Sequence, residues 1–115
     1  MKAFDINRIP LKIQSPHVTT NSVLHTNILA EVEKLGKHFS RISKCEMMLR
    51  IDNKRHSPCE VDIKVFVPGS MLYTRGRANE FPPAVASAFK DMHEQLRRYK
   101  EKMEDKKAGE ISENE

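Results

Sequence analysis

The sequence contains no tryptophan, only two cysteines and no long apolar run, and each shortage excludes a class of protein. Cys45 and Cys59 are too few for a disulfide scaffold. No stretch approaches the ~18 consecutive apolar residues of a transmembrane helix, which argues against a membrane protein. Residues 1–10 lack the apolar run of a secretory signal peptide, so we expect a cytoplasmic protein.

The residues that are present have the composition of one globular domain. Of the 115 residues, 38% are hydrophobic and 31% are charged, which is too apolar for a disordered chain. The length fits one domain, since most domains have ~100–150 residues. We expect an N-terminal arm at residues 1–10, a folded domain at 11–103 and a disordered tail at 104–115, because apolar periodicity fades from Glu104 onward.

The charge is divided unequally along the chain. The formal net charge is +4, yet residues 108–115 carry three glutamates and no basic residue. Residues 1–107 therefore hold all 20 basic side chains and 13 of the 16 acidic ones, a net charge of +7. A basic body with a short acidic tail suggests a polyanionic partner.

Periodicity predicts a strand and a helix in the first third of the chain. Residues 11–14 alternate between apolar and polar, which is the pattern of a half-buried strand. After several candidate N-cap residues at 19–22, apolar side chains recur at helical spacing for about 18 residues. This stripe comprises Leu24, Ile28, Val32, Leu35 and Phe39.

The middle of the chain has the two-residue period of β-strands. Apolar residues alternate with polar ones over residues 45–52, 60–67 and 72–79. Residues 53–58 and the Pro68-Gly69 turn connect these segments, and connections this short predict an antiparallel meander. A second helix begins near Phe81 and keeps an apolar stripe up to Met103.

The resulting element order is β-α-β-β-β-α, an α+β fold. We expect a four-stranded sheet with two helices packed on one of its faces, because this arrangement buries both helix stripes and the apolar side of the sheet.

The sequence carries no signature of a metal site or of catalysis. Only His56 and Cys59 are closely spaced among the histidines and cysteines, and no second pair accompanies them. No nucleophile elbow, phosphate-binding loop or kinase motif is present. We therefore expect no enzyme, no cofactor and no small-molecule substrate. Cys45 is expected in the core and Cys59 at the surface as a thiol near a turn.

Basic side chains are the remaining candidates for function. They gather at the end of the first helix, on the outward side of the strands and near the end of the second helix. Three interpretations stay open from the pattern alone. The basic residues form a nucleic-acid-binding surface, they belong to a protein-interaction module that binds no RNA, or they lie on solvated faces of mixed charge on which ion pairs form four residues apart.

Four segments resemble a known family, the bacterial hibernation-promoting factors, also called ribosome-associated inhibitors or sigma-54 modulation proteins. These segments are LKIQSPHV at residues 11–18, VEKLGKHFSRI at 32–42, MLRI at 48–51 and QLRRYKEK at 95–102. Together with the element order, they extend the resemblance over roughly residues 11 to 103. The chain resembles the short form of the family, which lacks a C-terminal dimerisation domain.

The resemblance implies a double-stranded-RNA-binding-like fold and a ribosome-associated translation inhibitor. Such a protein binds the ribosomal RNA of the small subunit through a basic surface and keeps ribosomes inactive in stress or stationary phase. The residues that occupy basic positions of the family pattern are Lys34, Arg41, Arg50, Arg98, Lys100 and Lys102. Neighbouring basic residues added to this predicted surface are Lys37, Arg75, Arg77 and Arg97.

One region departs from the family pattern. In the middle of the second helix, where the family presents basic residues, Asp91 and Glu94 are acidic. This favours an alternative, a protein-interaction module on the same fold that does not bind the ribosome. Its patch, or the interface of a weak homodimer, would use Met48, Phe66 and Tyr73 at outward strand positions.

Overall fold

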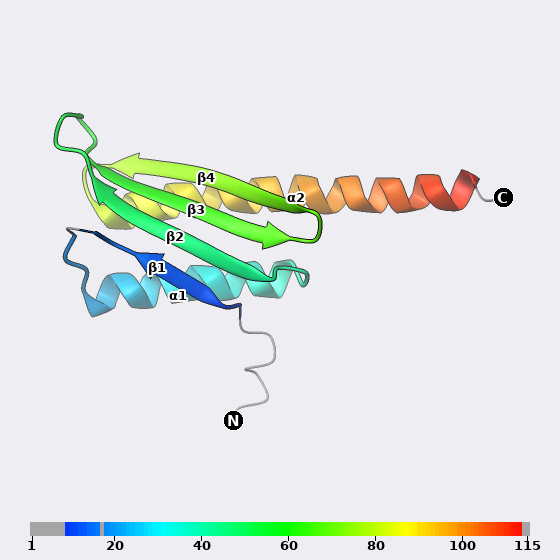
Figure 1. The fold of residues 1–115 in the computed structure, drawn as a ribbon, viewed down its shortest axis with the longest axis horizontal. Helices are drawn as coiled ribbons and strands as arrows, with labels where there is room; N and C mark the ends of the chain where they lie inside the picture. The colour runs from blue at the N-terminus through cyan, green and yellow to red at the C-terminus, as the bar shows by residue number, and fades with distance from the viewer. Residues whose placement is uncertain (1–8, 17, 114–115) are drawn as a thin grey trace, which may run out of the picture.

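The computed structural model describes residues 9–16 and 18–113, with side chains up to residue 104. Four strands and two helices follow one another in the predicted order (Figure 1). They are β1 (Leu11–Gln14), α1 (Ser22–His38), β2 (Lys44–Ile51), β3 (Cys59–Val67), β4 (Ser70–Ala78) and α2 (Phe81–Glu113). The predicted α+β fold is confirmed.

The strands form one sheet in the order β1-β2-β3-β4. β1 runs parallel to β2 because α1 returns the chain to the same end of the sheet, whereas β2, β3 and β4 are an antiparallel meander. Both helices lie behind the sheet in Figure 1, and no helix or strand of the described residues covers its other face. We call this uncovered side the open face.

Local signals define the limits of α1. The side chain of Asn21 accepts a hydrogen bond from the backbone N–H of Leu24 at 2.8 Å, as an N-cap residue does. The helix ends where the N–H of Phe39 donates to the carbonyl of Leu35 at 2.8 Å. The predicted apolar stripe is buried from Leu24 to Leu35, so it packs α1 on the sheet.

The β3–β4 hairpin depends on its two turn residues. Gly69 has a φ of +74°, a value that L side chains rarely adopt. Pro68 precedes it, and proline followed by a glycine of positive φ suits a type II turn. The carbonyl of Pro68 accepts a hydrogen bond from the hydroxyl of Tyr99 at 2.8 Å, which ties the turn to α2.

α2 packs very closely on β4. A Cβ atom on Gly76 would overlap the carbonyl oxygen of Ala84 and lie 2.9 Å from the nitrogen of Ala88. Beside it, the hydroxyl of Thr74 donates to the carbonyl of Ala88 at 3.0 Å. The glycine therefore sets the distance between helix and strand.

The core lies between the sheet and the helices. Phe89, Ile28, Leu35 and Leu49 are among its largest fully buried side chains. Cys45 is buried as expected, and burial, with a smaller effect of Glu46, raises the pKa of its thiol to about 12. The expectation of a surface thiol at Cys59 was wrong, because the side chain is buried at the start of β3.

The backbone of α2 remains helical to Glu113, ten residues beyond the end of the apolar stripe at Met103. The sequence pattern predicted a tail from residue 104, and the division into arm, domain and tail stays a prediction. None of the helices in the described part of the chain is both long enough and apolar enough to span a membrane.

Candidate nucleic-acid interface

A hollow of about 410 Å³ lies where the end of α1 meets the second half of α2. Its walls come from α1, from the loop that leads into β2, from the end of β3 and from α2. We call it the helix-end hollow. It is lined by Lys37, His38, Phe39, Ser40, Arg41, Ile42, Val67, Leu96, Tyr99, Lys100, Met103 and Glu104.

Three of the predicted RNA-binding residues meet at this hollow. Lys37 is in the last turn of α1, Arg41 follows that helix, and Lys100 is on α2. All three are exposed, and none has an ion-pair partner among the side chains described. Glu104 is the one carboxylate among the described side chains that line the hollow, so these side chains together carry an excess of positive charge.

Aromatic and imidazole rings pack together beside the hollow. The ring centroid of His93 on α2 lies 5.8 Å from that of His38 and 6.1 Å from that of Phe39. Burial lowers the pKa of His93, and the nearby His38 and Lys34 lower it further, against the opposing effect of Glu31. The neutral form of His93 is thereby favoured between the two helices.

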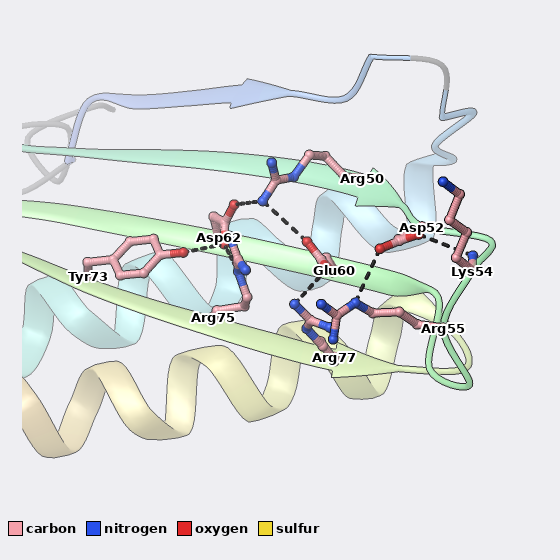
Figure 2. A network of polar contacts seen from close by, with 9 residues as sticks. All are labelled: Arg50, Asp52, Lys54, Arg55, Glu60, Asp62, Tyr73, Arg75 and Arg77. Atoms are coloured by element: carbon pink, nitrogen blue, oxygen red, sulfur yellow. Dashed lines mark hydrogen bonds and ion pairs between the residues drawn. The ribbon is translucent and has the colours of Figure 1, made fainter.

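A second group of predicted residues lies on the open face of the sheet. Arg50 on β2 pairs with Glu60 at 3.2 Å and with Asp62, both on β3 (Figure 2). From β4, Arg75 pairs with Asp62 at 2.7 Å and Arg77 with Glu60 at 2.9 Å. We call these five residues the open-face network.

The two carboxylates of the open-face network are largely covered. The side chains of Glu60 and Asp62 are only 8% and 13% exposed, because the arginines from both neighbouring strands cover them. Burial raises the pKa of Asp62, but hydrogen bonds from Arg75 and Tyr73 and the charges of Arg75 and Arg50 hold it below its ordinary value.

The remaining predicted residues lie on the outer surface of the helices. Lys34 is 3.7 Å from Glu31 on α1. On α2, Arg97 pairs with Glu94 and Glu101, and Arg98 is 3.4 Å from Glu94. Lys102 is exposed on the same helix.

The ten predicted residues therefore do not form one surface. Lys37, Arg41 and Lys100 meet at the helix-end hollow, whereas Arg50, Arg75 and Arg77 lie across the sheet from the helices. Whether any of them contacts RNA stays a prediction.

Sequence reasoning overlooked the apolar part of the hollow. Phe39 was assigned only to the apolar stripe of the first helix, and Tyr99 falls within the stripe predicted for the second helix. Both are half-buried and line the hollow. A signal was available, because each is the last aromatic residue of its stripe and has a cation within two positions. Among the described side chains, no three histidine, cysteine or acidic residues come together as a metal site would require.

Comparison with known proteins identifies the family. The model of the family described as sigma 54 modulation protein / S30EA ribosomal protein matches residues 11–104. A search of curated proteins found no significant match.

Solved structures share the fold. A ribosomal subunit interface protein from Coxiella burnetii is 17% identical, with a TM-score of 0.70, and the match covers 80% of this chain and 98% of that one. The N-terminal domain of Protein Y from Thermus thermophilus is 13% identical, with a TM-score of 0.67 and the same coverage of both chains. Because the family match spans most of the sequence, the chain belongs to the sigma 54 modulation / S30EA ribosomal protein family, whose members are ribosome-associated proteins and not enzymes.

Proposed function

We propose that this protein is a translation inhibitor that binds ribosomal RNA of the small subunit and holds ribosomes inactive in stress or stationary phase, in the cytoplasm. Family membership supports an association with the ribosome. The observation that carries the proposal is the group of exposed cations at the helix-end hollow, Lys37, Arg41 and Lys100. Lys and Arg contacts with phosphates supply most of the affinity for RNA.

The ten predicted residues differ in their expected contribution to RNA binding, because some already form ion pairs and others do not. A guanidinium already bound to a partly buried carboxylate has to share that partner with a phosphate, so it attracts RNA less than a solvated cation does. Arg50, Arg75 and Arg77 are in this state. We therefore assign the main contacts to the hollow and secondary contacts to the other predicted residues.

The acidic residues in the middle of α2 place the proposed RNA contact nearer to the C-terminal end of the helix. Glu94 pairs with both Arg97 and Arg98, and Asp91 lies one turn earlier on the exposed surface. The positive charge in the middle of α2 is therefore largely compensated. Lys100 lies beyond this region, so RNA would meet the C-terminal half of the helix first.

Charge reversal at the hollow tests the proposal. The variant Lys37→Glu, Arg41→Glu, Lys100→Glu should no longer pellet with small subunits, because three attractive contacts become repulsive. The matched control reverses three exposed lysines outside the ten predicted residues, Lys12, Lys54 and Lys64. It makes the same change in net charge and should still pellet. An equal loss of pelleting in both variants would show that only overall charge matters and would reject the site. A wild-type protein that stays free of ribosomes at low salt would reject the function.

The second candidate is a protein-interaction module that uses the open face of the sheet. Neither helix covers this face, and Tyr73 is 41% exposed on it while Met48 and Phe66 are partly exposed. This reading predicts a protein that does not pellet with ribosomes. Sedimentation velocity over a range of concentrations would then show whether the partner is a second copy of the chain.

A further inference from the structure

The helix-end hollow has an apolar floor under its cationic rim. Val67 and Leu96 are buried at the floor, the rings of Phe39 and Tyr99 are half-buried, and Met103 is exposed at the edge. The exposed cations of the lining, Lys37, Arg41 and Lys100, make up its rim. A rim that attracts phosphate would explain binding to any RNA backbone, but it does not explain the apolar floor.

A ligand that fits both parts carries a flat apolar group next to an anion. A nucleotide of single-stranded RNA has this chemistry, because its base is unstacked and its phosphates lie on either side of it. A base inside a duplex cannot leave the stack without a cost of a few kcal/mol. The volume of about 410 Å³ lies within the range of ligand pockets, roughly 300–1,000 Å³.

We propose that the hollow receives an unpaired base of the RNA, stacked against the ring of Tyr99, while the three cations of the rim bind the flanking phosphates. This rests on the proposed function and names the kind of RNA that the site selects. The protein would prefer an unpaired segment to a helical one, with little preference for base identity, since every base offers a flat face.

The position of Tyr99 suits this role. Its hydroxyl donates to the carbonyl of Pro68 at 2.8 Å, so the ring is held between α2 and the β3–β4 turn. A ring fixed before binding loses little conformational freedom when a base stacks on it. Its neighbour in sequence, Lys100, lines the same hollow.

Two oligomers of equal charge test the inference on the full chain. One is a seven-nucleotide oligoadenylate, and the other is a chain of abasic ribose units with the same number of phosphates. The protein should bind the oligoadenylate at least about fivefold more tightly, as expected for stacking of one base. Equal affinities would overturn the inference without the need for any variant.

Two substitutions of Tyr99 locate the base. Tyr99→Leu keeps an apolar side chain but removes the ring, so the preference for the oligoadenylate should disappear. Tyr99→Phe keeps the ring and loses the bond to Pro68, so the preference should remain. The unfolding midpoint and circular dichroism of each variant check that it is folded. A preference that survives in folded Tyr99→Leu would place the base elsewhere and reject this site.

Pelleting of the same proteins with small subunits separates this inference from the proposed function. If the wild type pellets but does not distinguish the two oligomers, the base pocket is wrong and the ribosomal function stands. If it neither pellets nor binds either oligomer, the proposed function fails as well. Tighter binding of an acidic peptide with an aromatic residue than of either oligomer would assign the hollow to a protein partner and overturn the inference.

Discussion

Asp62 connects more side chains on the open face than its sequence position suggests. It accepts hydrogen bonds from Arg50, from Arg75 at 2.7 Å and from the hydroxyl of Tyr73 at 2.8 Å (Figure 2). The three donors come from strands on either side of β3. A carboxylate that bridges strands in this way stabilises the sheet as well as setting its surface charge.

Replacement of this carboxylate should destabilise the fold. We expect Asp62→Asn to lower the free energy of unfolding by about 1–3 kcal/mol, the range for loss of a charged hydrogen-bond partner. Glu101→Gln is the control, since it removes an exposed pair on α2 that contributes little. Urea unfolding monitored by circular dichroism measures both. Identical midpoints for wild type and Asp62→Asn would mean that the network adds nothing to stability.

The same residue gives the network a pH dependence with a definite sign. The pKa of Asp62 is lower in the folded protein than its ordinary value of about 3.9. Its stabilising effect is therefore complete above about pH 4 and is lost as the pH falls through the folded pKa. Below about pH 4, the wild type should lose more stability than Asp62→Asn does, and parallel curves would contradict the assignment.

Residue-scale interactions were only partly predictable from the sequence. The alternating pattern places Arg50, Glu60 and Asp62 on one side of the strands, and the structure agrees. The pattern does not contain the register, which pairs Asp62 with Arg75 and Glu60 with Arg77 across β3 and β4. Register depends on the turns and on core packing together. The alternating pattern alone therefore could not show that these outward charges are paired and largely covered.

At the scale of elements, the closest contact is the one between α2 and β4. Gly76 allows it, because a side chain there would overlap the backbone of Ala84 and approach that of Ala88. Backbone cannot move away as the end of a flexible side chain can. The helix would have to shift along its contact with the strand.

We expect Gly76→Ala to destabilise the protein by about 1–3 kcal/mol, the usual cost of overpacking. Gly69→Ala is the comparison, since open space surrounds Gly69 and only its φ of +74° opposes a side chain. Thermal unfolding measures stability, and binding of the oligoadenylate reports on the helix-end hollow. Gly76→Ala should change both, because this residue sets the distance between α2 and β4. Gly69→Ala strains only the turn and should lower the melting temperature without moving α2 away from the strand. A normal melting temperature in Gly76→Ala would show that the helix adapts at no cost.

The elements themselves were predictable, apart from the end of α2. Apolar periodicity indicated both helices and all four strands, because each has one face against the core. The stripe ends near Met103, yet the helical backbone continues to Glu113. Lysine, glutamate and alanine favour helix without any burial, so a helix can continue where the hydrophobic pattern that predicts it has ended.

At the scale of the whole molecule, cations with an ion-pair partner should differ from cations without one in how much they contribute to the salt dependence of ribosome binding. Each phosphate contact contributes roughly 0.7–0.9 to the slope of log affinity against log salt concentration. Lys100→Ala should reduce this slope by about that amount. Arg97→Ala should reduce it less, because Glu94 and Glu101 already pair with Arg97. Equal reductions would mean that these ion pairs open at no cost when RNA binds.

The parallel pairing of β1 has a consequence for the order in which the molecule folds. β2, β3, β4 and α2 follow one another along the chain and can assemble through short connections. The pairing of Leu11 with Cys45, in contrast, closes a loop that contains the whole of α1. Long loop closure slows such contacts. With four residues and one neighbouring strand, β1 should be the last strand to join the sheet. Its amide hydrogens should also exchange with solvent before those of β3.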